Sequence, residues 1–530
     1  MVDLRRAAAI VGVHEHITRY APDKSELQIQ AESIQKALED AGLEKKDVDG
    51  LFCASMSVRS SGLNLADYLN LYPKMVDNTT VGGGSFEFHL SHALNAIHAG
   101  RINCAVITYA TQARSGGVSV GTGGISRQGH PRLDPSPDSF EELYGLTTVG
   151  LYAMIAQRHM HLYGTTSEQL AEVAVTMRRH ASLNPEALFR DPITVEDVMR
   201  SPVVSTPLHR NDCCVITDGG GAVVVASPEL ARNCKQKPVW ILGAGEAVAH
   251  QGAGKRDLMY IAAKQSHVPA FEMAGVTQKD IDMAMIYDSF TITVIETLED
   301  LGFCEKGEGG QYVLNGRIGL GGELPINTDG GGLSSNHPGM RGLFLLLEAT
   351  RQLRGQFEGT ERQVPDCNIA LCHGTGGALG SRHSGGTVIL ARDQIMTTWN
   401  KPLPTINGET KTFWDMARRG TLLIQKCDSC NEFQWYPRGI CANCWSSEIK
   451  WFPSTGRGTV WTYTVTNQNR TLGFDAGPYV LALVELDEGV RMFTNIVECD
   501  PKDVSIGMAV EVTFQQATPQ ISVPLFKPAS

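Results

Sequence analysis

An internal repeat is the feature that most constrains how this chain can fold. Residues 37–53 read ALEDAGLEKKDVDGLFC, residues 270–286 read AFEMAGVTQKDIDMAMI, and the two segments align without a gap. In each, a helical pattern stops at Ala-Gly, where glycine typically follows the last helical residue, and a polar turn leads into an apolar strand. The match predicts a duplicated unit with two similar halves packed together.

The sequence after each repeat also agrees between the halves. Each glycine run, at 82–84 and at 330–332, precedes an amphipathic helical pattern and then an apolar strand. Nearly continuous apolar strands that alternate with such helices are typical of an α/β fold whose sheets are covered on both faces. We therefore expect a domain over residues 1–395, with halves at about 1–235 and 236–395.

Composition excludes several classes of protein. A net charge of −11 argues against a general nucleic-acid binder, which needs a basic surface. No apolar run approaches the roughly 20 residues of a membrane span. The apolar run at 7–13 is followed by His14 and Glu15 instead of a cleavage site, so it is predicted to be a buried strand. The 13 cysteines are sparse until they suddenly occur in pairs, which suits a reducing compartment, and we expect a cytoplasmic protein.

Four motifs, in this order and spacing, resemble those of the thiolase superfamily. NHPG (336–339) looks like the motif Gly-His-Pro-x-Gly, with Asn336 in place of its first glycine, and the segment 212–223 looks like the family's Asp-Gly-Ala-Ala-Ala-Val. YDSF (287–290) resembles the His-Asp-Cys-Phe of sterol-carrier-type thiolases, and HGTGG, which begins at His373, stands where the last catalytic turn belongs. The resemblance covers about residues 5–395. It implies a layered α/β/α/β/α thiolase fold and a homodimer.

The nucleophile of a thiolase is missing. A thiolase uses a cysteine at the N-terminus of the buried helix after the first glycine run, where the helix stabilises a thiolate. Here that stretch reads VGGGSF, and the alignment puts Gly83 at the nucleophile position. The second family cysteine is also absent, because its turn begins with His373. Ser85 either replaces the missing thiolate as a nucleophile, for which it would need an adjacent base, or caps the helix, a position that serine favours.

The groups that remain suit chemistry through an enolate. We expect Gly83, Ser85 and Gly376 to contact the coenzyme A thioester, because hydrogen-bond donors aimed at a thioester oxygen stabilise an enolate. Resemblance to the steroid side-chain aldolases implies retro-aldol cleavage of a β-hydroxyacyl-CoA thioester to a shorter acyl-CoA and a ketone or aldehyde. Tyr287 would then transfer the proton of the β-oxygen. His337 and His373 would bind the thioester oxygen or protonate the enolate.

Two other functions stay open at this point. A thiolase or acyl-CoA acyltransferase could use a relocated nucleophile, and a non-catalytic acyl-CoA or lipid carrier would not need His337 or His373. An enoyl-CoA hydratase is a candidate partner that would feed the site. Asp288 follows Tyr287 in a predicted strand and should therefore point to the opposite face. The stretch 116–137, rich in Gly, Ser and Pro, is predicted to be a loop that shapes the acyl pocket.

The character of the chain changes after residue 395. Cys427 and Cys430 form one Cys-x-x-Cys pair, and Cys441 and Cys444 form another after ten intervening residues. This spacing is typical of a tetrahedral four-thiolate zinc site. Four protein ligands leave no open position for a substrate, so the predicted zinc is structural. We place a linker helix and zinc ribbon at 396–453.

Residues 454–530 are predicted to form an OB-fold barrel. They read as short strands separated by glycines, which fits a five-stranded barrel. Nucleic acid is not expected, because the segment has few basic residues. The order of ribbon and barrel resembles the acyl-CoA-associated OB module of thiolase-like enzymes, which implies that it docks on the thiolase domain.

Overall fold

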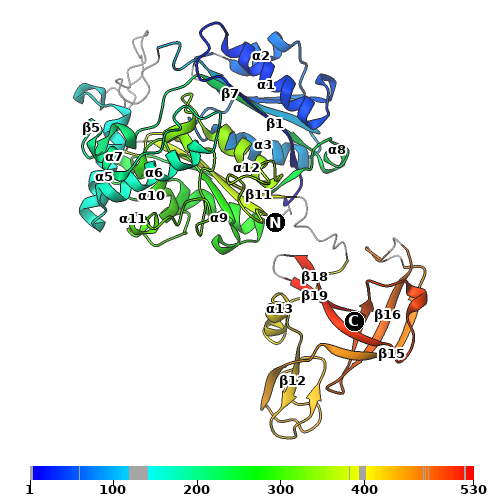
Figure 1. Cartoon of the computed structure of the whole chain (residues 1–530). Coiled ribbons are helices and arrows are strands. Elements are labelled where there is room, and N and C mark those ends of the chain that lie inside the picture. The colour runs from blue at the N-terminus through cyan, green and yellow to red at the C-terminus, as the bar shows by residue number, and fades with distance from the viewer. Residues whose placement is uncertain are drawn as a thin grey trace. The chain divides into compact units, whose positions relative to one another are not determined.

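The computed structural model describes residues 4–117, 141–392 and 401–529, apart from 56, 59, 381, 470, 472, 475–476 and 519–520. The predicted loop at 116–137 lies outside the described residues from position 118 on. The chain divides into two compact units, residues 1–393 and 394–530 (Figure 1). No helix in the described part is both long and apolar enough to cross a membrane.

The first unit contains a nine-stranded sheet in the order β3-β2-β4-β7-β1-β8-β11-β10-β9. Its strands are β1 (Ala9–His16), β2 (Gly50–Cys53), β3 (Met75–Asp77), β4 (Cys104–Thr111), β7 (Gly219–Ala226), β8 (Val239–Ala249), β9 (Met283–Ile286), β10 (Ile369–Gly377) and β11 (His383–Arg392). A separate two-stranded hairpin pairs β5 (Val203–Ser205) with β6 (Leu208–His209).

The pairing of strands is the same in both halves. In the first, β2 pairs parallel with β4, and then β4 with β7 and β7 with β1 pair antiparallel. In the second, β9 pairs parallel with β10, and then β10 with β11 and β11 with β8 pair antiparallel. In the first half the edge strand β3 pairs parallel with β2. In the second half a single parallel bridge between Ala284 and Ile326 stands at the equivalent place. The two halves join where β1 pairs with β8.

Helices complete the layers of this unit. α3 (Ser85–His98) and α12 (Gly342–Leu353) lie between the halves of the sheet, whereas α1 (Glu26–Ala41) and α9 (Ala263–Ala274) cover its outer faces (Figure 1). The predicted layered α/β/α/β/α thiolase-like fold is therefore confirmed. The other helices are α2 (Ser61–Leu69), α5 (Thr148–Tyr163), α6 (Ser167–Ser182), α7 (Val195–Arg200), α8 (Pro228–Ala231), α10 (Thr291–Asp300) and α11 (Gly309–Tyr312).

The same glycine contact brings the outer helix onto the sheet in each half. A β-carbon added at Gly12 in β1 would lie 2.1 Å from the carbonyl oxygen of Ala37, and one added at Gly243 in β8 would lie 2.0 Å from that of Ala270. Ala37 and Ala270 are the first residues of the two aligned repeats. Only glycine therefore allows the backbones of α1 and α9 to approach the strands so closely.

We expect Gly12→Ala and Gly243→Ala each to lower the free energy of unfolding by about 1–3 kcal/mol, because a methyl group inserted into a packed core forces the backbone apart. Denaturant unfolding measures this. Gly219→Ala is the matched control, since its added β-carbon would come no closer than 3.4 Å to any neighbouring atom. Unchanged stability of both test variants would contradict this account of the packing.

The second unit contains a short helix, a small sheet and a barrel. α13 (Lys411–Ala417) precedes a three-stranded sheet of β12 (Leu423–Cys427), β13 (Phe433–Gln434) and β14 (Ile449–Pro453). The closed barrel has the order β15-β16-β17-β19-β18. Its strands are β15 (Arg457–Thr466), β16 (Tyr479–Leu486), β17 (Arg491–Ile496), β18 (Ala509–Thr518) and β19 (Ile521–Pro528). The predicted five-stranded barrel is confirmed.

Candidate active site

An aromatic ring occupies the space that a nucleophile would need. A β-carbon added at Gly83 would lie 2.3 Å from Cε2 and 2.6 Å from Cζ of Tyr287, and 2.5 Å from the carbonyl oxygen of Thr375. Non-bonded carbon atoms do not approach so closely, since their optimal separation is about 3.5–4.0 Å. Any side chain at position 83 would therefore have to displace both the Tyr287 ring and the backbone at Thr375, which gives a physical reason for the glycine at this position.

Tyr287 is held at this position from both ends. β9 ends at Ile286, and the Tyr287 backbone N–H donates to the carbonyl oxygen of His373 at 3.0 Å. Its hydroxyl lies 3.0 Å from Nε2 of His337 and accepts the backbone N–H of Arg341 at 3.2 Å. Burial raises the pKa of Tyr287 well above its ordinary value, so the residue is a neutral phenol near pH 7.

His337 is the partner of that phenol. Its backbone N–H donates to the hydroxyl of Thr217 at 3.1 Å, and its ring meets the Tyr287 ring edge-on. Burial, and then the charge of Arg341, lower the pKa of His337 to about 3, so the imidazole is neutral. Because the phenolic oxygen already accepts from Arg341, the Tyr287 hydroxyl donates its own proton to Nε2 of His337. The proton of the neutral imidazole then lies on Nδ1. Nδ1 is buried and has no hydrogen-bond partner among the described residues.

Arg341 anchors the turn that carries His337. Its side chain is fully buried; Nη2 lies 2.8 and 2.6 Å from the two carboxylate oxygens of Asp329, and Nε lies 3.4 Å from Asp288. Asp288 in turn accepts the backbone N–H groups of Gly332 and Leu333. The strand alternation expected for Tyr287 and Asp288 does not apply. The strand ends at Ile286, so strand alternation does not extend to residue 288, and both side chains contact Arg341.

His373 lies apart from the Tyr287–His337 pair. Its Nδ1 is 2.9 Å from the hydroxyl of Thr387, which is 2.8 Å from that of Ser266 in α9. The preceding Cys372 instead contacts the carbonyl oxygen of Leu345 in α12, as expected for neighbours in a strand. The ring of His373 therefore faces α9, whereas Tyr287 and His337 gather at the ends of α3 and α12. Burial raises the pKa of Cys372, which keeps that thiol un-ionised.

Ser85 and Gly376 shape the turns beneath the pair. The Ser85 hydroxyl donates to the carbonyl oxygen of Gly82 at 2.6 Å and accepts the N–H of Val81 at 3.0 Å. The N-cap of α3 is Gly84, so Ser85 closes the preceding turn and is not the helix cap. A β-carbon added at Gly376 would lie 1.9 Å from the carbonyl oxygen of Val81, so glycine there lets the two glycine-rich turns touch.

Two ionisable residues of this region, Arg341 and Glu87, were not predicted from the sequence. Glu87, in the first turn of α3, is 1% exposed, and its carboxyl group has no hydrogen-bond partner in the part of the chain that the structure describes. Burial raises its pKa well above the ordinary value, so it is a neutral acid packed against Gly342 and Gly374. An acidic residue on the apolar face of a buried helix is the signal that could have revealed Glu87.

The four cysteines of the second unit converge as a metal site. Their sulfur atoms all lie within 4.8 Å of one another, and the Cys427–Cys444 and Cys430–Cys441 pairs are each 3.7 Å apart. A tetrahedral zinc ion with bonds of about 2.3 Å needs sulfur–sulfur distances of about 3.8 Å, so these residues fit zinc. Backbone N–H groups of Asn443 and Cys444 donate to the Cys441 sulfur, which stabilises a thiolate.

Comparison with known families and proteins agrees with both units. Residues 245–392 match a family described as thiolase C-terminal domain-like. Residues 414–449 match the rubredoxin-like zinc ribbon domain of ChsH2, and residues 451–515 match the C-terminal OB-fold domain of ChsH2. A steroid side-chain-cleaving aldolase of Thermomonospora curvata is 36% identical over 384 residues, which cover 70% of this chain and 95% of the relative. The chain belongs to the thiolase superfamily.

Other similar proteins include an acyltransferase as well as an aldolase. An acetyl-CoA acetyltransferase of Methanothermobacter thermautotrophicus is 34% identical over 401 residues, which cover 71% of this chain and 98% of the relative. A solved structure described as Ltp2-ChsH2(DUF35) aldolase is 33% identical with a TM-score of 0.65, and the match covers 74% of this chain and all of that one. Thiolase-superfamily membership alone therefore does not decide between aldol cleavage and acyl transfer.

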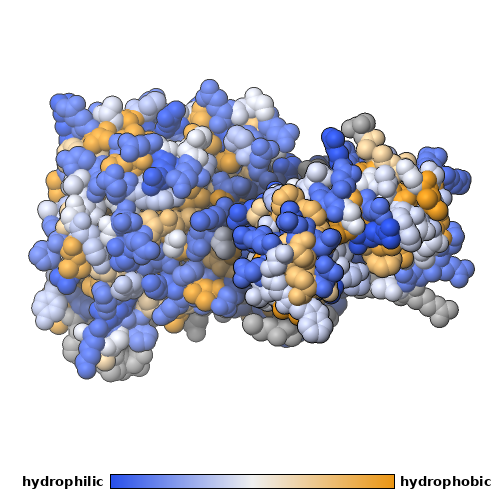
Figure 2. Space-filling model, turned by 90° about the horizontal axis from the view of Figure 1, so that it is seen from below, coloured by the Kyte–Doolittle hydropathy of each residue, from blue (hydrophilic) through white to orange (hydrophobic). Residues whose placement is uncertain are grey.

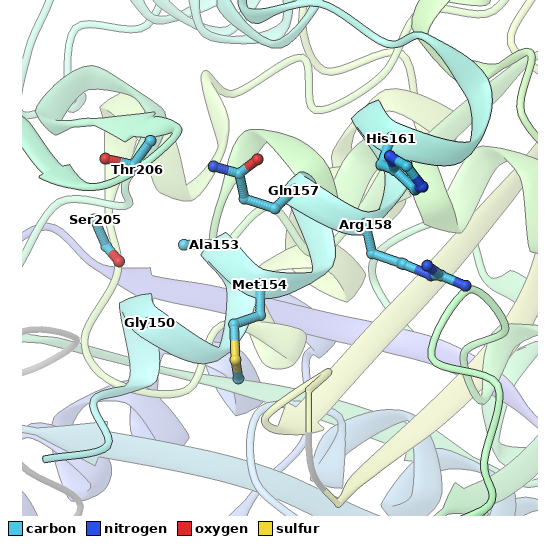
Figure 3. Close-up of a pocket in the computed structure, with 8 residues that line it drawn as sticks. All are labelled: Gly150, Ala153, Met154, Gln157, Arg158, His161, Ser205 and Thr206. Atoms are coloured by element: carbon cyan, nitrogen blue, oxygen red, sulfur yellow. The ribbon is translucent and has the colours of Figure 1, made fainter. Parts of the chain in front are cut away.

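An open surface depression of about 380 Å³ lies away from these residues. Figure 3 shows its lining side chains on one face of α5 and on the β5–β6 hairpin, and none of the predicted site residues is among them. The face of the molecule seen in Figure 2 carries many hydrophilic residues, with hydrophobic residues in separate patches. Nothing in this depression resembles the neutral acid–base pair of the thiolase-like site.

We expect Cys441→Ser to lose zinc and to lower the thermal midpoint of the second unit, because removing even an outer partner of a metal ligand costs about 10–100-fold in affinity. Elemental analysis of the purified protein measures the zinc content. Cys499→Ser is the control, since Cys499 is a cysteine of the same unit outside the four-sulfur cluster. A full equivalent of zinc in Cys441→Ser would contradict the assignment.

Proposed function

We propose that this chain is a carbon–carbon lyase. It cleaves a β-hydroxyacyl-CoA thioester by a retro-aldol reaction to a shorter acyl-CoA and a ketone or aldehyde, through a CoA-thioester enolate. The observation that carries the proposal is the Tyr287 ring in contact with Gly83, because it fills the volume in which the nucleophile of an acyltransferase would lie. Two relatives described as aldolases support the same reaction class.

The pair of Tyr287 and His337 provides the acid–base chemistry of this proposal. The Tyr287 oxygen takes the proton of the β-hydroxyl group as its own proton passes to Nε2 of His337, 3.0 Å away. The Cα–Cβ bond then breaks, the β-carbon leaves as a carbonyl compound, and the electron pair forms the enolate. The free Nδ1–H of His337 stabilises the enolate oxygen. The proton returns from His337 through Tyr287 to the α-carbon, so the overall reaction is balanced.

We assign the remaining predicted residues supporting roles. Gly83, Ser85 and Gly376 form the glycine-rich turns against which the thioester of the coenzyme A substrate lies. His373 holds β10 against β11 through Thr387, which is consistent with its ring facing α9. Zinc bound by the four cysteines stabilises the ribbon and takes no part in the reaction.

We further propose that the enzyme is a cytoplasmic homodimer. The edge strand β3 supports an assembly through the first unit, because an edge strand presents unpaired backbone groups to a partner. An enoyl-CoA hydratase is the proposed supplier of the substrate, since hydration of an α,β-unsaturated thioester makes the β-hydroxyacyl thioester that this reaction consumes.

We expect Tyr287→Phe and His337→Asn each to lower kcat by about 10²–10⁴-fold, because each removes a member of the acid–base pair. Steady-state release of the carbonyl product, with unchanged zinc content and thermal midpoint, measures this loss. Because His337 stays neutral down to about pH 3, the kcat/KM profile should show no inflection near the ordinary histidine pKa of 6.5. Tyr312→Phe, a buried tyrosine of α11, is the matched control. Wild-type kcat in Tyr287→Phe would overturn the mechanism.

A further inference from the structure

Asn336 departs from the glycine of the superfamily motif, and its backbone does not explain why. Its φ of −152° and ψ of 146° are extended values that any residue adopts, so the position does not require the conformational freedom of glycine. Its side chain is fully buried. A buried amide needs hydrogen-bond partners, and the contacts of Asn336 therefore indicate what the residue does.

The amide of Asn336 connects the two halves of the duplicated fold. Nδ2 donates to Oε1 of Glu15 at 2.7 Å, and Oδ1 accepts from Nη1 of Arg341 at 2.8 Å. Glu15 belongs to β1 in the first half, whereas Arg341 immediately precedes α12 in the second. Asn336 therefore lies between a buried carboxylate of one half and a buried guanidinium of the other.

Both neighbours of Asn336 are charged. Burial alone would raise the pKa of Glu15, but Arg19 and Arg351 hold it at about 2. Arg19 lies 2.8 Å from Oε1 of Glu15 and Arg351 lies 3.2 Å from Oε2, so the carboxylate has cations on two sides. Between an anion and a cation, an amide can donate with its nitrogen and accept with its oxygen. A carboxylate at this position would have no proton to donate, and glycine would have no side chain to offer.

We propose that Asn336 is the positioning residue of the Tyr287–His337 pair, which it holds in place by linking Arg341 to Glu15. Asn336 directly precedes His337, and its amide bonds to the residue whose backbone N–H donates to the Tyr287 hydroxyl. One side chain therefore fixes both ends of the segment 336–341. The kinetic part of this inference rests on the proposed lyase function, whereas the link between the halves does not.

A pair of substitutions that exchanges donor and acceptor tests the link. Asn336→Asp places a second carboxylate beside Glu15 and removes the donated proton. Glu15→Gln removes the anion that faces Arg19 and Arg351. In the double variant Asn336→Asp/Glu15→Gln the introduced amide can donate to the introduced carboxylate, which still accepts from Arg341. The double variant has one carboxylate and one amide at these two positions, so its total charge equals that of the wild type.

We expect Asn336→Asp and Asn336→Gly each to lower kcat by at least about tenfold, with KM within about threefold of the wild type. The double variant should have a kcat at least about fivefold higher than that of Asn336→Asp, because contacting residues in one network are energetically coupled. Asn184→Asp is the matched control. Asn184 is a buried amide that accepts from Arg362 and donates to the carbonyl oxygen of Asp329 and the hydroxyl of Ser335. It makes no hydrogen bond to Glu15, so Glu15→Gln should not rescue Asn184→Asp.

Two results would overturn the inference: wild-type kcat in Asn336→Gly, or a double variant no more active than Asn336→Asp. Asn336→Gly keeps the test decisive if the charged variants fail to fold, because glycine is the residue of the motif itself. If the wild-type protein releases no carbonyl product, the proposed function fails. The link between the halves is then decided by the thermal midpoint of unfolding. This midpoint must be higher in the double variant than in Asn336→Asp.

Discussion

The fully buried guanidinium of Arg341 is the group on which the candidate site depends. A charge in a protein interior is stable only when partners surround it, and Arg341 has Asp329, Asp288 and Asn336 within 3.4 Å. These partners come from separate segments of the second half. Because the backbone N–H of Arg341 also binds the phenol of Tyr287, the charge network and the acid–base pair form one structure.

The chemistry follows from which atoms fill the space at the N-terminus of α3. In an acyltransferase of this superfamily a helix N-terminus would stabilise a thiolate at the position of Gly83. Here the Tyr287 ring fills that space and its hydroxyl meets a neutral imidazole. In the proposed mechanism the scaffold therefore stabilises an enolate without a covalent intermediate at position 83. Different reactions on one fold are common, because function depends on a few residues of the site.

Much of the fold could be predicted from the sequence, because its signals are local. The repeat at residues 37–53 and 270–286 predicted the duplicated α/β unit, and two Cys-x-x-Cys pairs predicted the zinc ribbon. Gly83 was placed at the nucleophile position from its glycine run. The reason for that glycine could not be predicted, since it is a contact with Tyr287 some 200 residues later in the chain. Such tertiary contacts leave no periodic pattern in a single sequence.

The directions of individual side chains were the least predictable feature of the site. Strand alternation could not place Asp288, which contacts Arg341, because β9 ends at Ile286. His373 faces α9 because of its place in β10. A shift of one residue in a strand reverses the face of a side chain. Arg341 and Glu87 were missed because sequence alone favours the surface for charged residues, and only the packing shows that both are buried.

The most direct test of the central claim is to follow the protein and its products together during turnover. The wild-type chain would be mixed with a panel of β-hydroxyacyl-CoA thioesters, including one with a steroid side chain, and quenched within the first turnovers. Intact-mass spectrometry would report the protein, and trapping of the carbonyl would report the product. We predict one ketone or aldehyde for each shorter acyl-CoA, with the protein mass unchanged. An acylated protein that forms and decays at the turnover rate would contradict the account.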